Sequence, residues 1–232
     1  MTNVSSIIDN ALKEGRNALL EYEANAVCSS YGVPVAKVKL AKTSSEAIKN
    51  ADEIGYPVVL KIVSPDILHK SDAGGVIVNV NSANEVKEGF TKIVNNAKKY
   101  KADANVLGVL VQEMAPSSTE VIVGMTKDPT WGPALMFGLG GIFVEVLKDV
   151  SFRVAPITER DANEMVREIK AFKILEGVRG QPPADINAIV DILLKISKLV
   201  MDNPKIDEID LNPVFVYEDG AKAVDTRILI KE

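Results

Sequence analysis

The apolar residues of the first hundred positions follow two different spacings. Three segments carry apolar residues every three or four positions, as helices do: 20–31, 47–54 and 86–97. Three short segments are rich in apolar and β-branched residues, as strands are: 35–41, 58–63 and 76–80. Thr43 or Ser44 can cap the second helix, and Ser82 with Glu85 forms a capping box for the third. We therefore expect this part of the chain to alternate helices and strands.

The second half of the chain has a different texture. Four strands are expected there with few helices between them: 106–114, 119–125, 133–137 and 142–146. Thr158 and Asp161 open a helix that continues to about residue 169, and a further helix covers 188–200. With the first half, this pattern predicts a mixed α/β (α+β) fold.

The chain closes with a hairpin. Residues 206–217 and 221–230 alternate apolar and polar positions on either side of a turn at 218–220. No internal repeat is found. We expect two lobes, 1–105 and 106–232, with the break between them near residues 103–114.

Composition narrows the class of protein. The 232 residues carry a net charge of −5, and 47% of them are hydrophobic, which is ordinary for a globular protein. The acidic balance argues against nucleic acid or an anionic membrane as the main partner. No apolar run approaches the length of a membrane span, and the N-terminus does not resemble a secretion signal. Cys28 is the single cysteine, so we expect a cytoplasmic protein without an internal disulfide.

The closing hairpin carries the strongest local signal. Glu208, Asp210 and Asn212 alternate with apolar residues, so the three polar side chains share one face of a strand. The turn at Gly220 brings Asp225 back to a position nearly opposite Asn212. Hard oxygen donors in this arrangement suit Mg²⁺, which completes its coordination with phosphate oxygens and water. The alternative is a solvated face on an edge hairpin.

Two other features could meet an anion. Lys61 lies inside the apolar segment 58–63, and a buried ammonium group is costly unless an anion accompanies it. A phosphate is one such partner, and the alternative is a lysine on an edge strand whose stem reaches water. The glycine-rich connection at 138–141, which includes Gly140 and Gly141, lets backbone N–H groups approach an anion closely. Glycines there could equally serve a turn.

The end of the strand 106–114 could recognise a base. Gln112, Glu113 and Met114 lie where the two lobes are expected to meet, and backbone groups at a strand end can hydrogen-bond an adenine edge. Glu120, on the next strand, could then bind ribose hydroxyls. The alternative is an ordinary strand end with Glu120 at the surface.

His69 is the single histidine in the sequence. It lies in the connection 64–75, which has no core periodicity, and long connections of this kind are often functional. A neutral imidazole is nucleophilic near pH 7, and histidine is a recognised route to covalent intermediates. The alternative is an exposed loop histidine without a catalytic role.

Several of these segments resemble one family. Residues 20–24 (LEYEA), 31–34 (YGVP) and 59–61 (VLK) are similar to the opening of the β subunit of succinyl-CoA synthetase, and 210–213 (DLNP) with Asp225 resembles its magnesium-binding hairpin. That subunit has the ATP-grasp fold, in which two α/β lobes close on a nucleotide. The loop around His69 is closer still to the β subunits of ADP-forming acetate–CoA ligases. The similarity extends over about residues 18–230.

The resemblance implies the reaction acyl-CoA + ADP + phosphate ⇌ carboxylic acid + CoA + ATP. An α subunit would hold CoA and the acyl phosphate in an α₂β₂ assembly, and His69 would relay the phosphoryl group to ADP. The resemblance also assigns roles to residues already singled out: phosphate contact by Lys61; a nucleotide-binding role for Gln112, Glu113, Met114 and Glu120; the phosphoryl site at Gly140 and Gly141; and Mg²⁺ ligation by Asn212 and Asp225, with Asp210 as a lesser candidate.

Two other functions remain open at this point. A stand-alone ATP-grasp ligase that joins a carboxylate to an amine would have no need of a nucleophilic loop histidine. A non-catalytic nucleotide-sensing module would not be expected to keep His69, Lys61, Asn212 and Asp225 together. The combination therefore favours the phosphoryl relay.

Overall fold

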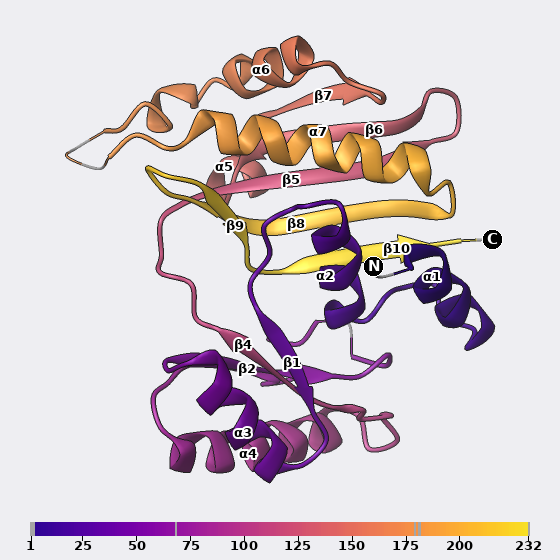
Figure 1. The fold of residues 1–232 in the computed structure, drawn as a ribbon, viewed down its shortest axis with the longest axis vertical. Helices are drawn as coiled ribbons and strands as arrows, with labels where there is room; N and C mark the ends of the chain where they lie inside the picture. Colours follow the sequence, from indigo (N-terminus) through magenta and orange to yellow (C-terminus); the bar gives the residue numbers. More distant parts are fainter. Residues whose placement is uncertain (1–2, 68, 179, 181, 232) are drawn as a thin grey trace. The chain divides into compact units, whose positions relative to one another are not determined.

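The computed structural model describes residues 3–67, 69–178, 180 and 182–231 (Figure 1). The chain divides into two compact units. Unit 1 consists of residues 1–19, 23–35 and 116–232, and unit 2 consists of residues 20–22 and 36–115. Unit 1 is therefore built from both ends of the chain, whereas unit 2 is almost entirely one continuous segment.

Unit 2 contains a four-stranded antiparallel sheet in the order β1-β4-β2-β3. Its strands are β1 (Val38–Ala41), β2 (Val58–Val63), β3 (Val76–Val80) and β4 (Gly108–Glu113). Two helices pack against the sheet and against each other, α3 (Ser44–Ile54) and α4 (Ala83–Tyr100). Every residue of β2 is buried, as its sequence, apolar except for Lys61, predicts for an interior strand.

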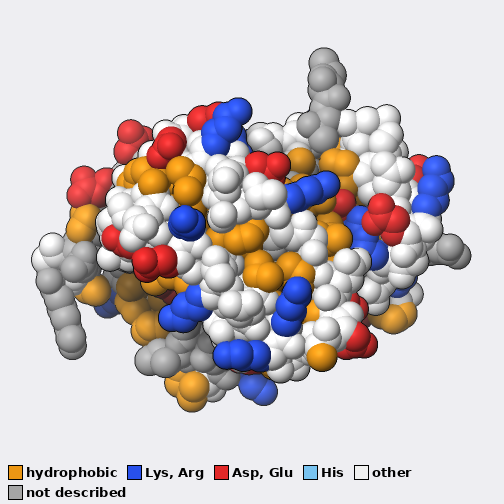
Figure 2. All heavy atoms as spheres, turned by 90° about the horizontal axis from the view of Figure 1, so that it is seen from below, with side chains coloured by type: hydrophobic (Ala, Val, Ile, Leu, Met, Phe, Trp, Pro, Cys, Tyr) orange, Lys and Arg blue, Asp and Glu red, His pale blue; other side chains and the backbone are white. Residues whose placement is uncertain are grey.

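Local capping explains where these two helices begin. The Oγ1 of Thr43 accepts the N–H of Glu46 at 3.2 Å, so Thr43 rather than Ser44 is the N-cap of α3. In α4, the Oγ of Ser82 accepts the N–H of Glu85 at 3.3 Å. Acidic and basic side chains are interspersed over the exposed side of α3 and α4, the face seen in Figure 2.

Unit 1 contains an antiparallel sheet in the order β10-β8-β5-β6-β7, with a short extra strand, β9, beside β8. Its strands are β5 (Thr119–Asp128), β6 (Gly132–Leu139), β7 (Val150–Val154), β8 (Ile206–Val216), β9 (Ala221–Ala223) and β10 (Thr226–Ile230). The helices of this part of the chain are α1 (Val4–Lys13), α2 (Glu21–Ser30), α5 (Ile142–Glu145), α6 (Glu159–Glu168), the 3₁₀ turn Phe172–Ile174 and α7 (Ile186–Asp202).

One face of this sheet is covered by α6 and α7. α7 packs against β5, β6 and β8, and α6 packs against β6 and β7 (Figure 1). The core between them is mostly aliphatic but includes the aromatic Phe137, with Leu135, Met125 and Ile209 among its other buried side chains. Burial of this apolar surface is the main contribution to the stability of unit 1.

Three elements differ from the sequence expectations. The segment 142–146, expected as a strand, begins with the short helix α5, so that prediction was wrong. Gly141 adopts a φ of +61° and turns the chain after β6, and the N–H of Val144 then donates to the Gly141 carbonyl at 3.2 Å. β7 and α1 were not expected at all.

The compact units also differ from the expected lobes 1–105 and 106–232. β4 pairs with β1 and β2 and therefore belongs with the first half of the chain. The N-terminal residues lie with the second half, because the N–H of Leu19 donates to the Ile228 carbonyl at 2.9 Å. Among the described residues, no helix is both long enough and apolar enough to cross a membrane.

Candidate functional site

The polar face of β8 is arranged as its alternating sequence predicts. Ile209 and Leu211 are buried in the core of unit 1, while Asp210 is half-buried and Asn212 is exposed. β8 lies between β5 and β10, and β10 forms the edge of the sheet. The side chains of Asp210 and Asn212 are therefore presented on an interior strand of the sheet.

Asp225 returns opposite Asn212, as expected. The N–H of Asn212 donates to the carbonyl of Asp225 at 3.3 Å, one residue beyond the pair formed by Thr226 and Leu211. The hairpin is interrupted there, because β9 ends at Ala223 and β10 begins at Thr226. Asp225 thus occupies a break in the ladder rather than a regular strand position.

The carboxylates around Asp210 form a site that favours a cation. Desolvation raises the pKa of Asp210, and the negative charges of Glu208 and Asp225 raise it further, against the lowering effect of Arg227. Within the described part of the chain, no three His, Cys, Asp or Glu side chains are placed to hold a metal ion. The predicted set instead combines two carboxylates with the amide of Asn212. These are oxygen donors of the kind that Mg²⁺ accepts alongside phosphate and water.

The glycine-rich turn lies against β5. The N–H of Gly140 donates to the Glu120 carbonyl at 2.8 Å, and a Cβ at Gly140 would lie 3.0 Å from the Cβ of Glu120. Glycine therefore permits a close approach of the two segments. Because the Gly140 N–H is already used, an anion at this turn has to be met by other groups. The side chain of Glu120 is exposed, as in the surface alternative.

Lys61 is paired with a carboxylate that the sequence analysis did not single out. Its Nζ lies 2.6 Å from Oε1 of Glu21, and only 9% of the lysine side chain and 3% of the glutamate side chain are exposed. β2 is an interior strand, so the alternative of an edge-strand lysine is wrong. The anion beside Lys61 in this structure is thus a carboxylate, whereas the predicted partner was a phosphate. The two residues are 40 positions apart, and no local pattern connects them.

His69 is exposed and lies between β2 and β3, in the connection 64–75. On the N-terminal side of His69, Ile67 is buried in the core of unit 2. Asp66 accepts the N–H of Asn105 at 2.6 Å and lies 3.4 Å from the ammonium group of Lys101. The connection is thus attached to the body of unit 2 before it reaches the histidine.

The connection is attached again after His69. The N–H of Gly75 donates to the Lys70 carbonyl at 2.8 Å, and the N–H of Ile62 on β2 donates to the Gly75 carbonyl at 2.7 Å. Asn96 of α4 donates to the Gly74 carbonyl at 2.9 Å. A Cβ at Gly75 would lie 2.5 Å from Cγ2 of Ile62, which explains the glycine at this position. His69 therefore lies in a short segment whose two flanks, at residues 66–67 and 74–75, are both attached to unit 2.

Two backbone N–H groups at the end of β4 already have hydrogen-bond partners. Gln112 is buried, and the N–H groups of Glu113 and Met114 donate to the carbonyls of Lys37 at 2.9 Å and Pro57 at 3.3 Å. A purine at this strand end would have to be met by other atoms of these residues.

The predicted site residues form two groups, one in each compact unit. Unit 2 contains Lys61, His69, Gln112, Glu113 and Met114. Unit 1 contains Glu120, Gly140, Gly141, Asp210, Asn212 and Asp225.

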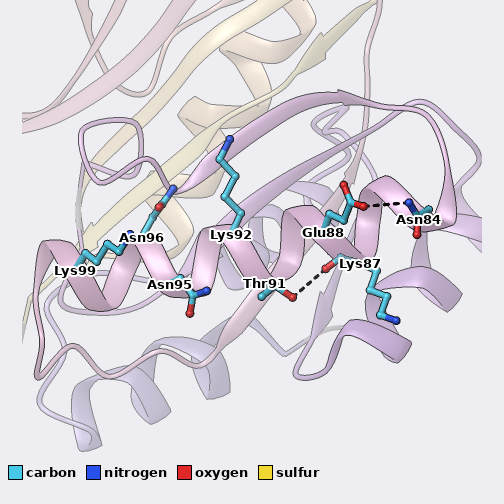
Figure 3. A pocket seen from close by; sticks show the side chains of 8 residues that line it. All are labelled: Asn84, Lys87, Glu88, Thr91, Lys92, Asn95, Asn96 and Lys99. Carbon is cyan, nitrogen blue, oxygen red and sulfur yellow. Dashed lines mark hydrogen bonds between the residues drawn. The ribbon is translucent and has the colours of Figure 1, made fainter.

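Two further features of the described chain, a hollow along α4 and the buried Cys28, are poor candidates for a catalytic site. A shallow hollow runs along α4 and is lined by residues of that helix, Asn84 to Lys99, none of which was predicted as a site residue (Figure 3). Burial raises the pKa of the Cys28 thiol to about 12, so this cysteine is not a nucleophile at neutral pH.

Comparison with known proteins relates the chain to one group of enzymes. The ATP-grasp domain family matches residues 10–230. The β subunit of acetate–CoA ligase (ADP-forming) II from Pyrococcus furiosus is 57% identical over 97% of both chains. Acetate–CoA ligase (ADP-forming) I from Archaeoglobus fulgidus is 51% identical over 97% of this chain, which spans 33% of that longer protein. 4-Hydroxybutyrate–CoA ligase (ADP-forming) from Nitrosopumilus maritimus is 49% identical over 96% of this chain and 32% of its own length.

Solved structures of acetyl-coenzyme A synthetase 1 from Ca. Korarchaeum cryptofilum are similar throughout. Its complex with coenzyme A and Ca-AMPCP matches with a TM-score of 0.97 and 49% identity, over 99% of this chain and 100% of that chain. Two further states cover the same shares at 47% identity. One has a phosphorylated phosphohistidine segment in the site I orientation, with a TM-score of 0.93. The other has Mg-AMPPCP and the phosphohistidine segment pointing towards the nucleotide-binding site, with a TM-score of 0.88.

Proposed function

Because the chain belongs to the ATP-grasp family of ADP-forming acetate–CoA ligase β subunits, we propose that it is the nucleotide-binding subunit of an ADP-forming acyl-CoA synthetase. The enzyme catalyses acyl-CoA + ADP + phosphate ⇌ acid + CoA + ATP. A partner α subunit converts the acyl-CoA and phosphate to an acyl phosphate and takes up the phosphoryl group. This chain then transfers that group to ADP.

The observation that carries the proposal is the single histidine. A relative of 47% identity contains a phosphohistidine segment, and His69 is the one residue of this sequence that could carry such a group. It is exposed, and the connection that bears it is anchored on both sides. In the final step, the N–P bond of phospho-His69 breaks and an O–P bond to the terminal phosphate of ADP forms. The electron pair of the broken bond stays on that nitrogen, and a proton on the other ring nitrogen makes the released imidazole neutral.

The other site residues support this step by positioning and by charge compensation, which phosphoryl transfer requires more than acid–base chemistry. Asn212 and Asp225 would hold Mg²⁺, with Asp210 beside them, and the ion would neutralise charge on the phosphate oxygens. Lys61 contacts the nucleotide phosphates, and Gly140 and Gly141 line the phosphoryl site. Gln112, Glu113, Met114 and Glu120 complete the nucleotide site.

The lengths of the relatives support a partner. The single-chain ligases are about three times as long as the segment that this chain matches, whereas a relative covered over 97% of its own length is named as a β subunit. Relatives named for acetate and for 4-hydroxybutyrate are both close to 50% identical to this chain. We infer that the partner contains the CoA and acid sites and selects the acid, in an α₂β₂ assembly.

Phosphorylation of His69 tests this function directly. Incubation of the assembled enzyme with labelled Mg-ATP is expected to place an acid-labile, base-stable phosphoryl group on this chain. His69→Ala and His69→Asn should both abolish labelling and turnover, because neither side chain is a nucleophile of this kind. Nucleotide affinity should change little, since the imidazole is not proposed to hold the resting nucleotide.

A general-base role for His69 predicts a different result. No label would then appear on the chain, and turnover would fall only by about 10²–10⁴-fold in the His69→Ala enzyme. Label that persists on the His69→Ala chain would also contradict the relay, because no other histidine is available.

A further inference from the structure

We propose that Glu21 is a positioning residue that holds Lys70, and through it His69, beside Lys61 while the histidine is unphosphorylated. This inference rests on the proposed relay function of His69. Each oxygen of the Glu21 carboxylate is assigned to a different lysine, Oε1 to Lys61 and Oε2 to Lys70.

The two lysines belong to different parts of unit 2, one on a strand and the other in a connection. Lys61 lies within the interior strand β2, and only 9% of its side chain is exposed. Lys70 follows His69 directly in the connection between β2 and β3, and 23% of its side chain is exposed. Glu21 thus links the histidine-bearing connection to a fixed strand.

Burial gives this link its strength. The Glu21 side chain is 3% exposed, and removing one partner of a buried ion pair leaves charge poorly compensated. Movement of Lys70 away from Glu21 therefore carries a free-energy cost, which favours the position seen here. Because Lys61 shares the same carboxylate, we infer that this is the nucleotide side of the relay.

A phosphoryl group on His69 would weaken the link. Such a group carries a charge of about −1.5 to −2 at pH 7, and Lys70 is the nearest lysine in sequence. The phosphoryl oxygens compete with Glu21 for Lys70, and the Glu21 carboxylate repels them. The segment is therefore held before phosphorylation and released after it. In the related acetyl-CoA synthetase, the phosphorylated segment is in the site I orientation.

Hydrogen exchange in the assembled, unphosphorylated enzyme tests the link without ligands. The Gly75 N–H is bonded to the Lys70 carbonyl and the Gly74 N–H to the Ser71 carbonyl, so both report on the anchored segment. Glu21→Gln and Lys70→Met should each accelerate exchange at these amides by about tenfold, because a charge-assisted hydrogen bond is roughly twice as strong as a neutral one. Lys70→Arg should retain most of the protection.

Glu23→Gln is the matched control. It removes a carboxylate of low exposure from the same helix, where Glu23 pairs with Arg16. Exchange at Gly74 and Gly75 should remain as in the wild type. A general loss of folding in a test variant would instead accelerate exchange throughout that chain, including the amides of β2 and β4.

Kinetics then separate the roles of the two lysines. Glu21→Gln and Lys70→Met should each slow the labelling of His69 by Mg-ATP about tenfold, and the double variant should be no slower than either single variant. Nucleotide affinity should be unchanged in Lys70→Met. Phosphoryl transfer between the α subunit and His69 should not slow in any of these variants.

Two results would overturn the inference. Unchanged exchange and labelling in Glu21→Gln would show that Glu21 does not hold the segment. Weaker nucleotide binding in Glu21→Gln, with unchanged exchange, would show that it acts through Lys61 alone. If the wild-type enzyme is never labelled on His69, the relay itself fails, and the exchange result still decides the role of Glu21.

Discussion

Asn212 and Asp225 meet through their backbones where the ladder between β8 and β10 is broken, so their side chains are not needed for the core below. The residues proposed to bind Mg²⁺ are therefore different from those that stabilise the fold at this strand. The proposed Mg²⁺ site can be altered while Ile209 and Leu211 continue to hold the strand.

Asn212→Ala and Asp225→Ala should each lower turnover at limiting Mg²⁺ by about 100-fold or more, since a bound metal supplies several kcal/mol of charge stabilisation in phosphoryl transfer. The melting temperature should change by no more than about 2 °C. Glu218→Ala is the control, because Glu218 is an exposed carboxylate in the turn of the same hairpin. Turnover assays over a range of Mg²⁺ concentrations make the test, and normal activity of both variants at low Mg²⁺ would exclude the assignment.

Among the elements, the connection between β2 and β3 is the most informative, because its N-terminal anchor depends on an ionised carboxylate. The N–H of Asn105 lowers the pKa of Asp66 below its ordinary value of 3.8, and Lys101 lowers it further, against desolvation. An acid with a depressed pKa in the folded state stabilises the fold above its unfolded pKa. That contribution is lost as the pH falls through the folded value.

We therefore expect the amide resonance of Asn105 to titrate with a midpoint below 3.8 and to remain constant near neutral pH. Asp66→Asn should abolish this titration, because the amide that replaces the carboxylate does not ionise. The measurement is a series of ¹H–¹⁵N spectra over acidic pH. A midpoint at or above 3.8 would mean that Asp66 does not anchor the connection.

The elements also show what a sequence can and cannot reveal. α6 was expected because its apolar residues repeat at helical spacing behind Thr158 and Asp161, and α7 was expected from the spacing of its apolar residues alone. α5 was mistaken for a strand because a short apolar run has no distinctive period. β7 alternates as a strand should, but Ser151 faces the core while Phe152 and Val154 are exposed, the reverse of the usual pattern.

The candidate site was predictable only in part. The alternation in β8 identified Asp210 and Asn212, since neighbours along a strand fix which face a side chain occupies. Glu21 was missed because its contacts with Lys61 and Lys70 join positions far apart in the sequence. The hydrogen bonds that the backbone N–H groups of Gly140, Glu113 and Met114 donate could not be predicted either, because they depend on which segments pack together.

For the whole molecule, the proposed function requires a partner. The named strands of both sheets pair antiparallel, so neither sheet supplies the parallel βαβ unit on which nucleotide-type cofactors such as CoA commonly bind.

The isolated chain should therefore show no turnover with acetyl-CoA, ADP and phosphate, and an α subunit should restore it. The His69→Ala chain with the same α subunit is the control. Robust ATP formation by the isolated chain would contradict the assignment of the CoA and acid sites to the α subunit.

The origin of unit 1 from both ends of the chain has a consequence for biosynthesis. The chain leaves the ribosome from its N-terminus at roughly 5–20 residues per second. Once residue 115 has emerged, all of unit 2 is available to fold, while residues 1–19 still lack the C-terminal strand that they pair with in unit 1. The Leu19 N–H bonds the Ile228 carbonyl, and the Ile230 N–H bonds the Asn17 carbonyl. The pairing of residues 17–19 with β10 can form only after β10 has been synthesised. This pairing closes a loop of nearly the whole chain, and the entropy cost of closing so long a loop slows it. In pulse-labelled refolding, the amides of Leu19 and Ile230 should gain protection after those of β2 and β4, and earlier protection would exclude this order.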